Sequence, residues 1–267
     1  MRIIKTVIIG VVIFLIFLYM YQDKLIFFPQ SISVGQLQHI KNLGNKVEEL
    51  TLTMKDGTKL HGWFVKNGRS EKLKTLIYFG GNGDELSYMV DMANKFAGWS
   101  VVFVNYRGYG LSEGKPSEEN LFADSLEIYD YVVNRTDVDK TKMVVTGRSL
   151  GTGVATYVAA NRVLAGVILV SPYDKLSSPG KEAYPFLPIE MLLKHNFDSI
   201  SRAPTIKTPL LMLIATEDTV VSPLYSKKLA AKWGGEVLLQ EIENENHDSI
   251  LNNEKLWGKI GNFLKRI

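Results

Sequence analysis

Short apolar runs alternate with segments of helical periodicity along most of this chain. The apolar runs lie at residues 75–79, 100–105, 143–146, 166–170, 210–215 and 236–242, and the helical patterns at 85–97, 118–134, 150–161, 224–233 and 249–265. Runs that are apolar at successive positions are typical of strands buried on both faces. Their alternation with helices predicts an α/β fold, in which helices cover both faces of a mostly parallel sheet.

The segment ahead of these runs has a different pattern. The sequence VEELTLTMKDGTKLHGWFV, residues 47–65, alternates apolar and polar residues on both sides of Lys55-Asp56-Gly57. This pattern predicts an antiparallel β-hairpin at one edge of the sheet. With 267 residues, of which 46% are hydrophobic, the chain is long enough for one large α/β domain or two small ones.

The composition excludes several classes of function. The formal net charge is only +3 and no dense basic stripe occurs, so nucleic-acid binding has no electrostatic support. The chain has no cysteine, which excludes disulfides, thiolate metal sites and a cysteine nucleophile. Since no H-E-x-x-H motif or carboxylate cluster occurs either, we expect no metal and no organic cofactor.

The first 24 residues, MRIIKTVIIGVVIFLIFLYMYQDK, do not have the pattern of a globular domain. The uncharged run 6–22 would form a helix of about 26 Å, close to the roughly 30 Å of a bilayer core. Tyr19 and Tyr21 stand at one end of this run, as in the aromatic belts of membrane proteins. We therefore expect residues 1–24 to be a retained, single-pass membrane anchor. A cleaved signal peptide and a buried core helix are the alternatives, and the bulky residues after the run disfavour cleavage.

The charges that flank the anchor bear on its orientation. Arg2 and Lys5 favour an N-terminus in the cytoplasm, although Lys24 at the other end weakens this bias. The remainder of the chain would then lie on the extracytoplasmic side. A cysteine-free domain that faces outward favours a bacterial inner membrane.

Beyond the anchor, we expect a juxtamembrane linker at 25–46 and one domain at 47–267. Within that domain, residues 172–205 carry five of the nine prolines of the chain and many aromatic residues. An irregular aromatic insertion after a strand predicts a cap over a pocket, and an ordinary long crossover is the alternative.

A serine stands among three glycines in MVVTGRSLGTGVA, residues 143–155. The segment has two interpretations, a phosphate-binding loop and a nucleophile elbow. The nearest phosphate-binding candidate, GYGLSEGKP, has five residues between its outer glycines and a proline after the lysine, and no glycine run has dinucleotide-binding spacing. Gly147-Arg148-Ser149-Leu150-Gly151 is G-x-S-x-G between a predicted strand and a predicted helix. That context favours a nucleophile elbow, in which the glycines leave space for a strained turn.

A nucleophilic serine needs a base and an acid that orients the base. His247 lies in the polar loop after the last strand, at the sheet edge where we also expect Ser149. The other three histidines lie in the linker, the hairpin and the insertion: His39, His61 and His195. Asp218 follows the strand at 210–215, and the order Ser149, Asp218, His247 is that of elbow-type hydrolases. Asp174, one strand earlier, is the rival acid.

An acyl-transfer site also needs hydrogen-bond donors for the oxyanion. The N–H of Leu150, directly after the serine, is the first candidate. The second lies in YFGGNGDE, residues 78–85, which follows the first long parallel strand. Gly81 lets the backbone turn there, so we expect the N–H of Asn82 to point into the site. A plain turn between strand and helix is the alternative.

These motifs together resemble the α/β-hydrolase fold and, within it, the membrane-anchored serine hydrolases related to the yeast bud-emergence hydrolases. YQDKLIFFP is similar to the entry segment of that family, YFGGNGDE to its oxyanion loop, and NYRGYGLSEGKPSEE, residues 105–119, to a family signature. GRSLGTG, SPYD, EDTVVSP and ENENHDSI follow in family order. The chain departs from the family at Gly80, where histidine is common. The resemblance implies that residues 106–110 form a structural turn beside the active site, braced by Arg107.

The resulting expectation is a membrane-anchored serine hydrolase of carboxylic esters or thioesters. Ser149 would attack the acyl carbon, His247 would carry the proton, and Asp218 would hold the imidazole. The N–H groups of Leu150 and Asn82 would bind the oxyanion. The anchor and the apolar insertion favour acyl or lipid-like small molecules as substrates. An aminopeptidase-like amide hydrolase and a non-catalytic binding or scaffold protein on the same fold are the alternatives.

Overall fold

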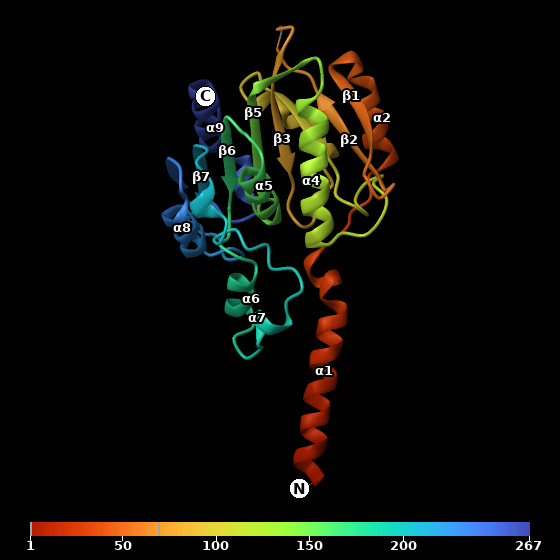
Figure 1. The fold of residues 1–267 in the computed structure, drawn as a ribbon, viewed down its shortest axis with the longest axis vertical. Coiled ribbons are helices and arrows are strands. Elements are labelled where there is room, and N and C mark those ends of the chain that lie inside the picture. The colour runs from red at the N-terminus through yellow and green to blue at the C-terminus, as the bar shows by residue number, and fades with distance from the viewer. Residues whose placement is uncertain (1, 69) are drawn as a thin grey trace.

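The computed structural model describes residues 2–68 and 70–267. Within these residues lies an eight-stranded sheet with the order β1-β2-β4-β3-β5-β6-β7-β8 (Figure 1). The strands are β1 (Val47–Thr53), β2 (Lys59–Val65), β3 (Leu73–Phe79), β4 (Ser100–Val104), β5 (Val138–Arg148), β6 (Gly166–Val170), β7 (Leu210–Ala215) and β8 (Val237–Ile242). β2 runs antiparallel to β1 and β4, and all other neighbours are parallel. The predicted parallel sheet with an antiparallel hairpin at one edge is confirmed.

The strand bounds agree with the apolar runs to within two residues except at β5. That strand begins at Val138, ahead of the run that starts at Met143. The added residues are mostly polar and partly exposed. Val138 pairs with Leu73 of β3, and pairing resumes at Met143 with Thr75 after a register shift. Because these residues have no apolar pattern, the sequence predicts only the buried part of β5.

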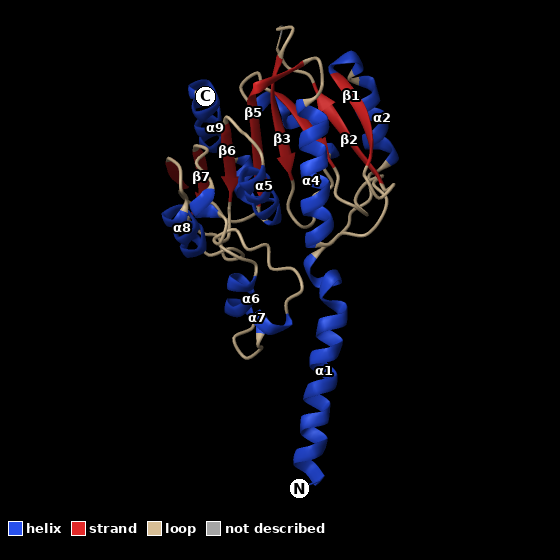
Figure 2. Cartoon of the chain, viewed as in Figure 1, coloured by secondary structure: helices blue, strands red, loops and turns tan. Residues whose placement is uncertain are grey.

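Helices cover both faces of the sheet, as expected (Figure 2). They are α3 (Ser87–Met92), α4 (Glu118–Val133), α5 (Leu150–Asn161), α8 (Pro223–Lys232) and α9 (Glu254–Arg266). Val102 and Val104 share one core with residues of α4, α5 and α8. Val101 and Phe103 share the opposite core with residues of α3 and α9. Alternate residues of β4 are buried in different cores. Successive positions of this strand are therefore apolar, without the alternation of a half-exposed strand.

The first helix of the domain is shorter than its pattern. In place of a helix at 85–97, the structure has α3 followed by a 3₁₀ turn at Ala93–Lys95. Asn105, at the end of β4, accepts the N–H of Leu86 at 2.8 Å through its side-chain oxygen, which fixes the loop ahead of α3. This contact joins residues far apart in the sequence, so helical periodicity does not reveal it.

The N-terminal helix α1 (Arg2–Ile26) extends away from the sheet (Figure 1). Ile3–Ile26 reaches a mean hydropathy of 2.7, and none of that most apolar window is buried. The helix is long and apolar enough to cross a membrane, by length and composition. Its exposure rules out the alternative of a buried core helix.

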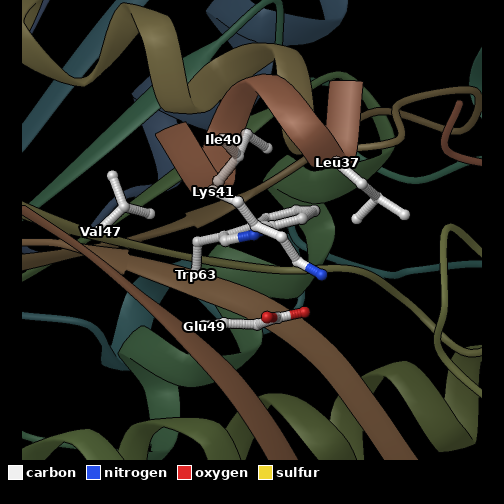
Figure 3. A pocket seen from close by; sticks show the side chains of 6 residues that line it. All are labelled: Leu37, Ile40, Lys41, Val47, Glu49 and Trp63. Carbon is white, nitrogen blue, oxygen red and sulfur yellow. The ribbon is translucent and has the colours of Figure 1, made fainter. Parts of the chain in front are cut away.

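The segment predicted as a linker contains a helix, α2 (Val34–Asn42), which packs against the hairpin. Ser33 caps α2 by accepting the N–H of Gln36, and Ile40 is buried in the same core as Trp63 of β2. A cavity of about 180 Å³ remains between helix and hairpin. Figure 3 shows its lining, which consists of Leu37, Ile40, Lys41, Val47, Glu49 and Trp63.

The segment predicted as a cap insertion, residues 172–205, connects β6 to β7. It contains α6 (Ser177–Ala183) and α7 (Ile189–Leu192), which lie on the side of the sheet toward which β3 and β6 point (Figure 1), and α7 contacts α1. The side-chain nitrogen of Gln22 in α1 donates to the carbonyl of Leu192 at 3.0 Å. The insertion and α1 therefore meet at the carboxyl-end edge of the sheet.

Candidate active site

Ser149 occupies a strained turn between β5 and α5. Its backbone has φ +48° and ψ −120°, and its N–H donates to the carbonyl of Val170 at 3.0 Å. A Cβ added at Gly147 would lie 2.3 Å from the carbonyl oxygen of Gly151, and one added at Gly151 would lie 2.2 Å from that of Phe79. Both positions therefore require glycine, and the serine is held in a left-handed conformation that only a tightly packed turn maintains.

The side chain of His247 lies between Ser149 and Asp218. Its Nε2 is 2.9 Å from Oγ of Ser149, and its Nδ1 is 2.8 Å from Oδ2 of Asp218. The other carboxylate oxygen of Asp218 accepts the N–H groups of Val220 at 3.0 Å and Val221 at 2.7 Å. A hydroxyl, an imidazole and a carboxylate in this order can transfer a proton from the serine and stabilise the imidazolium that results.

The surroundings of Asp218 favour its ionised form. Burial by itself raises the pKa of this carboxyl, but the hydrogen bonds from His247 and from the N–H of Val221 outweigh it, so the pKa lies below its usual value. Because Asp218 is only 5% exposed, its charge acts on His247 with little screening by water. This arrangement selects the tautomer of His247 with a proton on Nδ1, which leaves Nε2 free to accept the serine proton.

The other candidates for base and acid lie elsewhere. The remaining histidines pair with acidic residues away from Ser149: His39 with Asp91, His61 with Glu49 and His195 with Asp23. Asp174 is buried, and its carboxylate accepts the N–H of Lys175 at 2.8 Å. The geometry therefore favours Asp218 over Asp174 as the partner of His247.

The candidate oxyanion donors are two backbone N–H groups, one directly after the serine and one in the loop after β3. Among the described residues, neither the N–H of Leu150 nor that of Asn82 has a hydrogen-bond acceptor. The loop after β3 lies against the start of α5, because the missing Cβ of Gly151 leaves space for the carbonyls of Phe79 and Gly80. A Cβ at Gly80 would lie 2.8 Å from the side chains of both Asp84 and Leu86, which accounts for glycine at this position.

The signature that follows β4 holds this loop in place. The hydroxyl of Tyr106 donates to the carbonyl of Gly80 at 2.9 Å, and that of Tyr109 donates to the carbonyl of Asn82 at 2.5 Å. Tyr109 also accepts the N–H of Phe28, in the segment after α1, at 3.0 Å. The predicted structural turn therefore supports the loop that carries Asn82.

Arg107 connects this turn to the rest of the domain. Its guanidinium binds both carboxylate oxygens of Asp124 in α4, at 2.8 and 2.7 Å, and contacts Asp56 and Thr58 of the hairpin. Arg107 and Asp124 are both buried, and their paired charges satisfy each other. Arg107 thus braces the turn, as the resemblance implied.

Sequence reasoning missed two residues beside the serine. Arg148, directly before Ser149, contacts Asp84 at 3.2 Å and the carbonyl of His247 at 3.2 Å. Asp84 in turn accepts the N–H of Gly81 at 2.6 Å. A charged residue at the variable position of G-x-S-x-G, next to a buried turn, is the signal that could have pointed to this pair.

A cleft of about 360 Å³ borders Arg148 on the α3 side. Its lining consists of Asp84, Tyr88, Met89, Met92, Arg148, Asp248, Leu251 and Asn252. No group of three or more histidine, aspartate or glutamate side chains suited to a metal occurs in the part of the chain that the structure describes.

Comparisons with known proteins agree with this geometry. A family model described as alpha/beta hydrolase fold matches residues 74–202. An uncharacterized protein of Mycobacterium tuberculosis is 30% identical over 219 residues, which cover 81% of this chain and 77% of that protein.

Two yeast proteins are similar over most of their length. An uncharacterized membrane protein of Saccharomyces cerevisiae is 29% identical over 259 residues, which cover 92% of this chain and 90% of that protein. The protein bem46 of Schizosaccharomyces pombe is 28% identical over 219 residues, 78% of this chain and 73% of that protein. The resemblance inferred from the motifs is confirmed by these relatives.

Among solved structures, the esterase Pf2001 of Pyrococcus furiosus superposes with a TM-score of 0.68 and 21% sequence identity. The match covers 90% of this chain and 97% of that one. At this identity, the likeness shows a common fold.

Proposed function

Because the chain belongs to the alpha/beta hydrolase family, we propose that it is a serine hydrolase of carboxylic esters or thioesters. The observation that carries this proposal is the position of His247, in hydrogen-bond contact with Ser149 on one side and Asp218 on the other. The esterase among the structural neighbours supports the choice of an ester as substrate.

The proposed reaction begins at the elbow. Oγ of Ser149 attacks the acyl carbon while its proton moves to Nε2 of His247, and Asp218 stabilises the imidazolium. The N–H groups of Leu150 and Asn82 bind the oxyanion of the tetrahedral intermediate. The alcohol or thiol leaves with the proton from His247, and an acyl-enzyme remains.

Water completes the cycle. His247 takes a proton from the attacking water, the second tetrahedral intermediate forms, and Ser149 leaves with that proton as the acid is released. His247 therefore accepts or donates the proton in every transfer of the proposed cycle.

The N-terminal helix defines the proposed location. We propose that α1 anchors the enzyme as a single span, since none of its most apolar window is buried and the yeast relative is named a membrane protein. The domain would lie on the extracytoplasmic side of a bacterial inner membrane, with acyl or lipid-like substrates drawn from the nearby bilayer.

Labelling with a fluorophosphonate tests the nucleophile. Full-length protein in detergent should be labelled at Ser149, and the Ser149→Ala variant should not be labelled. Ser201→Ala is the matched control, because Ser201 is an exposed serine whose hydrogen bonds within the described residues are with Asp198, and this variant should keep the label. Folded wild-type protein without label would overturn the enzyme proposal and favour a binding or scaffold role.

A substrate panel tests the bond that is cleaved. Nitrophenyl esters of increasing acyl length, compared with the matching anilides, should show hydrolysis of the esters. Turnover of the anilides alone would overturn the ester assignment in favour of an amide hydrolase.

A further inference from the structure

The insertion between β6 and β7 carries an apolar tip that the rest of the domain leaves uncovered. This tip, residues 184–192, includes Tyr184, Phe186 and Met191, which are 53%, 77% and 87% exposed. Pro185 and Pro188 in the same segment limit its backbone freedom. Large side chains gathered on one exposed segment of a soluble domain indicate a surface that contacts an apolar partner.

The end of the tip is attached to the C-terminal end of α1. Gln22 is only 7% exposed, and its side chain donates to the carbonyl of Leu192 at 3.0 Å and accepts the N–H of Lys194 at 2.7 Å. Asp23 lies 2.9 Å from Nε2 of His195. Nζ of Lys194 lies 4.6 Å from the ring centre of Tyr19. These contacts fix the position of the tip along the axis of α1, next to residues 19–23.

The contacts lie at the part of α1 that is typical of the surface of a bilayer. Tyr19, Tyr21 and Lys24 stand at the end of the apolar stretch of α1, where aromatic and basic side chains lie at the lipid headgroups. The connection between α6 and α7 extends from the sheet in the direction of the N-terminus of α1 (Figure 1). From the level of Gln22, the tip therefore points toward the hydrocarbon region.

The charges of the tip suit a lipid surface. Glu190, the acidic residue of α7, is paired with Lys175 at 2.9 Å and Lys181 at 2.8 Å. Lys194 in turn lies 4.0 Å from Asp23. These charges are therefore paired within the protein and do not oppose contact between the apolar side chains of the tip and lipid.

We propose that residues 184–192 insert into the interfacial layer of the bilayer that α1 spans. The domain then has two attachments to the membrane, and the edge of the sheet with Ser149 faces the lipid surface. This inference rests on the proposed membrane span of α1 and is independent of whether the elbow is catalytic. An ester carried by a lipid would reach Ser149 by way of the insertion without crossing bulk water.

The absence of cysteine from the chain makes a fluorescence test direct. Full-length single-cysteine variants Phe186→Cys, Phe14→Cys and Val163→Cys carry an environment-sensitive fluorophore in nanodiscs with spin-labelled phospholipids. Phe14 lies within α1 and reports on the span. Val163 is 84% exposed in the turn between α5 and β6, at the opposite edge of the sheet, and is the matched control.

We expect quenching by shallow spin labels at position 186 to exceed that at 163 several-fold, and quenching by deep labels to be strongest at 14. Equal quenching at 186 and 163, with strong quenching at 14, would overturn the inference and leave the span intact. Absence of quenching at 14 would overturn both. Fluorophosphonate labelling of the same variants reports separately on the elbow.

Discussion

The guanidinium of Arg148 bridges Asp84 and the carbonyl of His247, with nitrogen–oxygen distances of 3.2 Å on each side. It thereby joins the loop after β3 to the loop that carries the histidine, immediately beside Ser149. Burial by itself lowers the pKa of Arg148, but the charge of Asp84 and neighbouring groups raise it overall, so the guanidinium stays charged. We infer that this ion pair keeps both loops at a fixed distance from the elbow.

The first prediction removes this bridge. Arg148→Met keeps an unbranched apolar side chain in place of the arginine stem but loses both contacts, so His247 and the Asn82 loop can shift relative to Ser149. We expect kcat for a nitrophenyl ester to fall about ten- to a hundredfold with KM nearly unchanged, because small misplacements affect the transition state most. Steady-state kinetics of the full-length protein measure both constants.

The control for this variant is Arg162→Met. Arg162 also pairs with a carboxylate, Asp130, at 2.7 Å, but at the opposite edge of the sheet, and its loss should leave kcat unchanged. A folded Arg148→Met protein with the kcat of wild type would contradict the positioning role.

A second prediction separates the two aspartates that the sequence left open. Asp218→Asn should lower kcat by about four orders of magnitude, because the amide favours the wrong imidazole tautomer while it keeps the shape of the site. Asp174→Asn, a buried aspartate one strand earlier, should keep most of the activity. Ester hydrolysis by the two variants, with circular dichroism as a check on folding, decides between them. Equal losses in the two variants would argue against Asp218 as the specific partner of His247.

The sequence predicts the fold and three site residues for one physical reason. Ser149, Asp218 and His247 each follow a strand with an apolar run, and parallel strands end at the same edge of a sheet. The hairpin can also be predicted from local sequence, because Asp56 and Gly57 form a turn in which Gly57 has φ +87°. Local patterns thus determine which loops meet.

Such patterns do not reveal contacts between residues that are far apart in the sequence. Arg148 and Asp84 meet because Phe79 of β3 pairs with Gly147 of β5, and no apolar run specifies that register. The same applies to Asn105, whose side chain binds the N–H of Leu86 directly ahead of α3. The domain bounds, the membrane orientation and the oxyanion role of Asn82 stay predictions.

A third prediction concerns the space at the elbow. A Cβ at Gly151 would lie 2.2 Å from the carbonyl of Phe79 and 2.5 Å from that of Gly80, so the loop after β3 must move. We expect Gly151→Ala to lose fluorophosphonate labelling and to have a lower melting temperature. Gly258→Ala is the control, because a Cβ there has no neighbour within 4 Å and lies inside α9. That variant should keep its label and gain up to about 1 kcal/mol of stability. Normal labelling of Gly151→Ala would show that the loop tolerates displacement.

The last prediction concerns the stability of the folded domain at low pH. Asp137 lies just ahead of β5, where Arg135 at 2.9 Å and Lys66 at 3.2 Å lower its pKa to about 2. An unfolded aspartate has a pKa of about 3.9, so the carboxylate stabilises the fold above that pH, and this contribution disappears as the pH falls to about 2. Since the side chain is 31% exposed, solvent screening reduces the expected loss in Asp137→Asn to about 1 kcal/mol at pH 7. Thermal unfolding in detergent should show this difference at neutral pH and only a small part of it near pH 2. A difference that persists unchanged at the lower pH would mean that packing, and not the charge of Asp137, stabilises this corner of the sheet.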